Sequence, residues 1–149
     1  METPEIKQEK PILFNNNDLV SYAEICVIVR TCGRTAFLPR ALRSIGQQTV
    51  LPRQVVVIVE GDNGASARAA VEGNWSGPAA TVEVIANPVA VGRGAALNQG
   101  LRAAHTTWIA VLDDDDTWQP RFLERALGFS ELVAGRVQGV ATLTTEVIE

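Results

Sequence analysis

The strongest constraint on the fold is Val55–Val59, a run of β-branched residues with no polar residue among them. A strand with one face in water alternates apolar and polar side chains, so this uninterrupted run predicts a strand buried on both faces. Such strands are typical of parallel sheets, in which a helix joins each strand to the next. Three further segments are expected to be strands of the same sheet, namely Ile25–Val29, Val82–Ile85 and Trp108–Leu112.

Helical segments lie between these runs. The first is indicated by apolar residues at helical spacing, which are Leu38, Ala41, Leu42 and Ile45. Further helices are expected up to Trp75, over Gly94–Ala104 and after Pro120, and the second of these is expected to bury Leu97, Leu101 and Ala104. The alternation predicts an α/β fold: a Rossmann-like, three-layer α/β/α sandwich around a mostly parallel sheet. Val137–Ile148 is expected to add a strand.

The 149 residues are expected to form one domain, because a chain of this length leaves no room for two. Residues 1–24 are polar and are interpreted as an N-terminal arm, and residues 25–149 as the domain. Cys26 and Cys32 lie too far apart on an extended segment for a disulfide, which favours a reducing compartment. Without a signal peptide or a long apolar run, we expect a cytoplasmic location, with any membrane attachment made through a longer parent chain.

The charge is unevenly distributed. The net charge of −4 argues against a general nucleic-acid binder, whose affinity comes from neutralising phosphates. Four of the acids form one run, Asp113–Asp116, directly after a predicted buried strand. Outside this run and the arm, the sequence has eleven arginines, eight acids and no lysine. An arginine-only body that carries one dense acidic spot is the charge pattern that a functional assignment has to explain.

The acidic run is the main candidate for a metal site. In parallel sheets, ligands bind outside the carboxyl ends of the strands. Four adjacent carboxylates repel one another, and a divalent cation relieves that repulsion. Asp113 and Asp115 point the same way from a strand end, so the pair predicts a site for Mn²⁺ or Mg²⁺. The alternative is a solvated acidic turn before the helix that follows Pro120.

Other strand ends carry polar candidates. Gly92-Arg93-Gly94 lacks the third glycine of a dinucleotide-binding fingerprint, so that function is rejected. Arg93 at a helix N-terminus still suits a phosphate or a base edge. Glu60 and Asp62 could accept hydrogen bonds from a base or ribose, and Thr31 could add a polar contact. Taken singly, each residue is more often ordinary loop chemistry, and the stronger indication is that they meet at one edge of the sheet.

The order of these motifs resembles family 2 glycosyltransferases of the GT-A fold. The matching segments run over residues 25–145 and are Arg30-Thr31-Cys32-Gly33-Arg34, Ser44-Ile45-Gly46-Gln47-Gln48-Thr49, Glu60-Gly61-Asp62-Asn63, Gly92-Arg93-Gly94-Ala95-Ala96-Leu97-Asn98-Gln99-Gly100 and Leu112-Asp113-Asp114-Asp115-Asp116-Thr117-Trp118-Gln119-Pro120. The chain departs from the family pattern where Glu60-Gly61 replaces a pair of acids and Cys32-Gly33 replaces Tyr-Asn.

The resemblance implies a role for each of these positions. Asp113 and Asp115 would be the D-x-D pair that holds the metal on a nucleotide-diphosphate sugar, with a UDP-sugar favoured. The nucleotide-binding residues would be Thr31, Glu60, Asp62, Arg93 and Asp114. The reaction would be an inverting hexosyl transfer to an unknown acceptor.

The resemblance covers the donor-binding part of such enzymes only. We expect a C-terminally truncated GT-A domain whose acceptor half and general base are absent, and which binds the donor but transfers little sugar alone. Two alternatives remain: a non-catalytic scaffold domain that kept the fold, and a sugar nucleotidyltransferase. The second is disfavoured because the body lacks a glycine-rich phosphate loop with a lysine.

Overall fold

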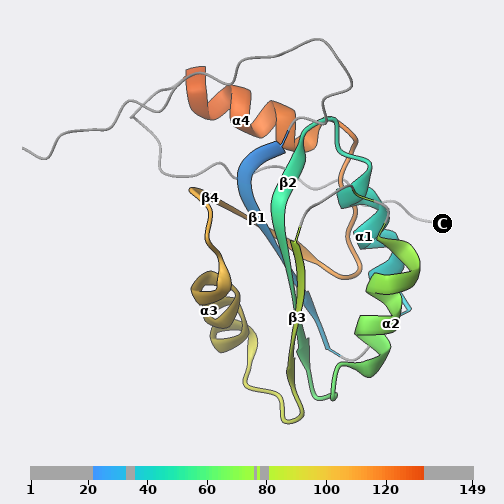
Figure 1. Ribbon diagram of the computed structural model, residues 1–149. Helices are drawn as coiled ribbons and strands as arrows, with labels where there is room; N and C mark the ends of the chain where they lie inside the picture. The colour runs from blue at the N-terminus through green and yellow to red at the C-terminus, as the bar shows by residue number, and fades with distance from the viewer. Residues whose placement is uncertain (1–21, 33–35, 76, 78–80, 133–149) are drawn as a thin grey trace, which may run out of the picture.

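The computed structural model describes residues 22–32, 36–75, 77 and 81–132, in which strands and helices alternate (Figure 1). The elements are β1 (Tyr22–Thr31), α1 (Leu38–Gly46), β2 (Leu51–Glu60), α2 (Ala65–Asn74), β3 (Thr81–Asn87), α3 (Arg93–Ala103), β4 (Trp108–Asp113) and α4 (Phe122–Leu132). The predicted elements are confirmed within this part of the chain, and β1 takes up the last three residues of the expected arm. The expected strand Val137–Ile148 and residues 1–21 lie outside the described residues.

The four strands form one sheet in the order β3-β2-β1-β4, and every neighbouring pair is parallel. The chain first steps outward from β1 to β3 and then crosses back to place β4 on the other side of β1. Such a reversal of strand order creates a crevice between the two strands at their carboxyl ends. The sheet therefore has its switch point between β1 and β4.

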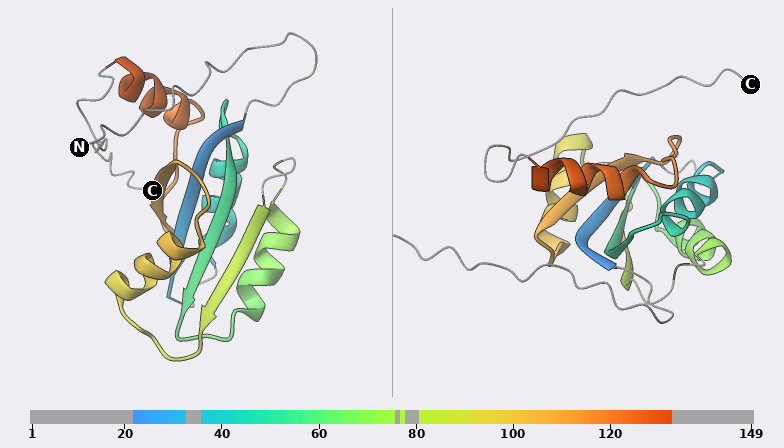
Figure 2. Two further views of the ribbon diagram at one scale, coloured as in Figure 1. Left: turned by 60° about the vertical axis from the view of Figure 1, so that its left-hand side comes forward. Right: turned by 90° about the horizontal axis from the view of Figure 1, so that it is seen from above.

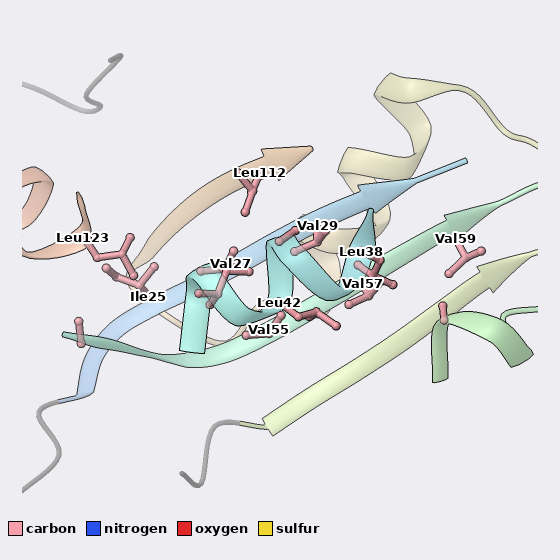
Figure 3. Packing of buried hydrophobic residues seen from close by; sticks show 14 residues of the cluster. Ile25, Val27, Val29, Leu38, Leu42, Val55, Val57, Val59, Leu112 and Leu123 are labelled. Carbon is pink, nitrogen blue, oxygen red and sulfur yellow. The ribbon is translucent and has the colours of Figure 1, made fainter. Parts of the chain in front are cut away.

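Helices cover both faces of the sheet. Figures 1 and 2 show α1 and α2 on one side and α3 on the other. Alternate strand residues such as Val27 and Val57 pack with α1, α2 and Leu123 of α4 in the larger buried cluster (Figure 3). The intervening residues, such as Ile28 and Val56, pack with Ala96 of α3 in a smaller cluster. The three-layer sandwich predicted from the continuous apolar runs is confirmed.

Local sequence explains where the helices begin. Pro39 lies in the first turn of α1, where the absence of an N–H costs little. Gly64 and Gly92 precede α2 and α3 with φ of 81° and 89°, in the region that glycine adopts without strain. No helix in the described part of the chain is long and apolar enough to cross a membrane.

Candidate donor-binding site

A pocket opens at the carboxyl ends of β1, β2 and β4, against the first turn of α3. Its lining residues are Arg30, Thr31, Cys32, Glu60, Arg93, Ala96, Asp113, Asp114 and Asp115. The pocket spans the switch point between β1 and β4, where the topology of the sheet predicts a ligand. Six of the seven residues predicted from the sequence to bind nucleotide or metal are among those that line it.

Strand alternation explains why charged residues from three strands meet there. Side chains of successive residues point to opposite faces of a sheet. Val29, Val59 and Leu112 point into the larger cluster beside α1, so the residue that follows each of them faces α3. These three following residues are Arg30, Glu60 and Asp113, and α3 adds Arg93 from the same side.

Arg30 and Asp113 form an ion pair inside the pocket. They are register partners on β1 and β4, and Nη2 of Arg30 donates a hydrogen bond to Oδ1 of Asp113. The Arg30 side chain is 20% exposed and that of Asp113 is 44% exposed. The backbone N–H of Asp114 also donates to the Arg30 carbonyl at 3.1 Å, which extends the β1–β4 pairing one residue further. The carboxylate expected to hold a metal is therefore held by an arginine.

Three buried polar atoms of the pocket residues have no hydrogen-bond partner. Among the described residues, the buried side-chain polar atoms without a partner are Nε of Arg30, Oγ1 of Thr31 and Oδ2 of Asp114. Thr31 and Asp114 are 1% and 4% exposed. Most buried polar atoms in proteins are paired. Their concentration around one pocket indicates that a polar ligand completes this network.

Glu60 orders the segment that leads into α3. Its Oε1 accepts a hydrogen bond from the Val91 N–H at 3.2 Å. On the neighbouring strand, Asn87 is the register partner of Glu60, and its side-chain amide exchanges hydrogen bonds of 2.8 and 3.0 Å with that of Gln99 on α3. Both contacts fix the approach to Arg93, so Glu60 shapes the pocket as well as lining it.

The acidic run continues beyond β4 as a turn supported by α1. Nη2 of Arg40 donates to the Asp115 carbonyl at 2.7 Å, and the Asp116 N–H donates to the Asp113 carbonyl at 3.1 Å. Partial burial, and then the carboxylates of Asp115 and Asp113, raise the pKa of Asp116, while Arg40 opposes this. Asp116 does not line the pocket, which separates it from the three preceding acids.

Asp62 and the aromatic residue of the last motif, Trp118, have local partners instead. Asp62 does not line the pocket, and its Oδ1 accepts a hydrogen bond from the Gly64 N–H at 2.7 Å in the turn before α2. A role of Asp62 in nucleotide binding stays a prediction. Trp118 stacks on Phe122 with the ring centroids 4.5 Å apart, so it packs on the start of α4.

The pocket fits a metal that is shared with a ligand better than a metal held by protein alone. In the part of the chain that the structure describes, no group of three or more His, Cys, Asp and Glu residues is arranged to hold a metal ion. Mg²⁺ and Mn²⁺ need only one or two carboxylates when water and phosphate supply the other ligands. The Asp113–Asp115 segment, with a buried unpaired carboxylate oxygen on Asp114, has the donor chemistry for such a site.

The model of the family "Glycosyl transferase family 2" matches residues 26–140. The chain belongs to this family. It is 33% identical over 103 residues to an uncharacterized glycosyltransferase of Haemophilus influenzae, and the match covers 69% of this chain and 33% of the relative. This family 2 chain thus spans about a third of the length of the curated relative that it matches.

Solved structures show the same fold. A Pyrobaculum calidifontis mannosyltransferase, PcManGT, in complex with GDP-Man and Mn²⁺ superposes with a TM-score of 0.60 at 23% identity, over 72% of this chain and 32% of that one. Residues 1–349 of S. aureus TarS in complex with UDP-GlcNAc give a TM-score of 0.62 at 22% identity, over 72% and 31%. The predicted GT-A fold is confirmed for this family 2 domain.

Three further residues line the pocket, Arg30, Cys32 and Ala96, to which the sequence pattern assigned no individual role, although Arg30 and Cys32 lie in the motif at the end of the first strand. Arg30 directly follows a buried apolar run, as Asp113 does, so the sequence indicates a charged residue at the end of each of these two strands. The β1–β4 register that pairs them depends on the strand order, which the sequence pattern leaves open.

Proposed function

We propose that the pocket of this family 2 domain binds the nucleoside diphosphate part of a sugar donor, with Mn²⁺ or Mg²⁺ held by Asp113 and Asp115. The observation that carries the proposal is the set of three unpaired buried polar atoms around one charged pocket at the β1–β4 switch point. The complexes of PcManGT with GDP-Man and Mn²⁺, and of TarS with UDP-GlcNAc, support it by analogy of fold.

The charge of the pocket explains why a cation is needed. The lining residues include two arginines and four carboxylates, so the pocket has a net formal charge of −2. A diphosphate brings further negative charge and would be repelled. A divalent cation between the carboxylates and the phosphates removes the repulsion, and when bound it would also stabilise the charge that develops on the departing nucleoside diphosphate.

The remaining lining residues supply contacts to the donor. Arg93 at the N-terminus of α3 offers a guanidinium and a positive helix end to the phosphates or the base. Oγ1 of Thr31 and Oδ2 of Asp114 are unpaired groups available to ribose hydroxyls or base N–H groups. Glu60 retains one carboxylate oxygen beyond the one bonded to Val91. The choice of a UDP-sugar remains a prediction.

Calorimetric titration of the chain with UDP, GDP and dTDP, each with and without Mn²⁺, tests donor binding. We expect Mn²⁺-dependent binding of at least one nucleotide. Asp115→Asn should weaken it strongly, whereas Asp116→Asn, which removes the neighbouring carboxylate outside the pocket, should change it little. Absence of heat in every combination would refute the proposal.

Inverting transfer of the sugar by the whole protein extends the same proposal, and the acceptor is unknown. The expectation that this chain alone transfers little sugar also stays a prediction. A non-catalytic scaffold domain would bind no nucleotide in the titrations above. It would also keep its cellular function after Asp115→Asn.

A further inference from the structure

The ion pair between Arg30 and Asp113 places a cationic side chain where the proposed metal would bind. We infer that Arg30 is an exchangeable counter-ion of this site: it holds Asp113 in the metal-free protein and passes to the diphosphate when metal and nucleotide bind. This inference rests on the proposed function and deepens it, because it assigns a role to a residue outside the predicted D-x-D and nucleotide-binding set.

The register of the sheet places Arg30 directly beside Asp113. Arg30, the last residue but one of β1, and Asp113, the last residue of β4, are directly paired in a parallel ladder, so their side chains leave the sheet on the same face. The hydrogen bond from Nη2 to Oδ1 leaves the guanidinium beside Asp113. A divalent cation bound to Asp113 would lie a few ångströms from that guanidinium, and like charges at that separation repel each other strongly, the more so because the cation carries two charges. Metal binding must therefore displace Arg30.

The Arg30 guanidinium is also incompletely paired. Its Nε is buried and has no hydrogen-bond partner, although the side chain touches the pocket. A purely structural ion pair would be expected to satisfy such a donor, because a buried donor left unpaired destabilises the folded protein. A phosphate group can accept from Nε and an Nη atom of one guanidinium together. The diphosphate thus offers Arg30 a more complete set of partners than Asp113 does.

Neutralising Arg30 is therefore expected to change the affinities for metal and for nucleotide in opposite directions. Arg30→Gln removes the competitor of the metal, so Mn²⁺ alone should bind about three- to tenfold more tightly. The same change removes a charged donor to the diphosphate, so UDP or GDP in the presence of saturating Mn²⁺ should bind roughly tenfold more weakly. A residue that only maintains the fold would weaken both interactions or neither.

Two further variants separate charge from structure. Arg30→Lys keeps a cation beside Asp113, so its Mn²⁺ affinity should stay near that of the unmodified chain, while it lacks the forked donors for phosphate. Arg53→Gln breaks a comparable pair between neighbouring strands, in which Nε of Arg53 lies 2.5 Å from Oε1 of Glu24 near the start of β2. Arg53→Gln should leave both affinities unchanged.

The experiment titrates the whole chain and these variants with Mn²⁺ alone, followed by the electron paramagnetic resonance of free Mn²⁺, and then with nucleotide at saturating Mn²⁺. Far-UV circular dichroism confirms that each variant is folded. Tighter Mn²⁺ binding together with weaker nucleotide binding in Arg30→Gln supports the inference. Unchanged or weaker Mn²⁺ binding in Arg30→Gln overturns it, and so does unchanged nucleotide affinity. Because the first comparison uses the metal alone, failure of the inference is distinct from failure of donor binding, which is judged on the unmodified chain.

Discussion

Gly100 of α3 lies directly against Ile28 of β1: a Cβ atom added to Gly100 would be 2.7 Å from Cγ2 of Ile28. Ile28 is fully buried and belongs to the cluster beneath α3, so it has little room to move. The absence of a side chain at position 100 lets the helix approach the sheet closely. About two helical turns earlier, the same helix presents Arg93 to the pocket. The contact between Gly100 and Ile28 therefore helps to set the depth of the site.

Gly100→Ala is expected to destabilise the protein by about 1–3 kcal/mol, because the added methyl group overpacks the cluster. The gain in helix propensity, about 1 kcal/mol, offsets part of this loss. Urea denaturation followed by circular dichroism measures the difference in the free energy of unfolding.

Gly128→Ala is the matched control for this prediction. Gly128 also lies within a helix, α4, but a Cβ atom there would meet nothing within 4 Å. This substitution should leave stability unchanged or raise it by up to about 1 kcal/mol. Equal effects of the two substitutions would contradict the close approach of α3 to β1.

The contact between α3 and the sheet also shows where hydrophobic periodicity gives a wrong prediction of the buried face of a helix. The spacing of large apolar residues predicted that this helix buries Leu97, Leu101 and Ala104. In the structure Ala96 and Gly100 are its buried residues, while Leu97 and Ala104 are partly buried against the same cluster and Leu101 is 43% exposed. Where a helix lies close to a sheet, the smallest residues face inward. A pattern read from hydrophobicity alone assigns the inner face to the largest ones.

The strands and the position of the site were more predictable. Continuous β-branched runs such as Val55–Val59 indicate burial on both faces, and that burial implies parallel pairing and a site at the carboxyl ends. The ion pair of Arg30 with Asp113 was not predictable, because it depends on which strands are neighbours and in what register. Local sequence specifies each element, whereas strand order is decided by the packing of all of them.

Gln48 links the end of α1 to the segment that follows the acidic run. The side chain is 5% exposed; its Nε2 donates to the Gln119 carbonyl at 2.8 Å, and its Oε1 accepts from the Leu123 N–H at 3.0 Å. Gln48→Met removes these bonds and leaves backbone groups without partners, so a loss of about 2–3 kcal/mol in the free energy of unfolding is expected. Gln47→Met, at the exposed neighbouring position, should change stability by less than about 0.5 kcal/mol. A similar loss in both variants, measured by urea denaturation, would argue against this role of Gln48.

Glu124 at the start of α4 predicts a dependence of stability on pH. Hydrogen bonds from Arg121, and then from Thr49, lower its pKa from the ordinary value of 4.5 to about 2. A carboxyl group with a lowered pKa stabilises the folded state above its ordinary pKa, and this contribution is lost as the pH falls toward the lowered value. Glu124→Gln should therefore lower the urea midpoint at pH 7, and its difference from the unmodified chain should shrink between about pH 4.5 and about pH 2.

Glu72→Gln is the control for this prediction: Glu72 is exposed on α2, and the urea midpoint of this variant should follow that of the unmodified chain at every pH. A difference for Glu124→Gln that stays constant down to pH 2 would contradict the prediction.

The two cysteines provide a native probe of the pocket. Cys32 is exposed and lines the pocket, whereas Cys26 is buried, and burial, followed by the nearby Glu83 carboxylate, raises the pKa of Cys26 to about 11. A thiol reacts as its thiolate, so only Cys32 should react with a maleimide in the folded chain, and both should react in urea. Saturating UDP and Mn²⁺ together should slow the modification of Cys32, because the bound nucleotide would cover it, and Cys32→Ser should abolish the fast reaction. Stopped-flow or mass-spectrometric measurement of the labelling rate tests this. An unchanged rate under conditions where calorimetry shows the nucleotide bound would place the nucleotide outside this pocket.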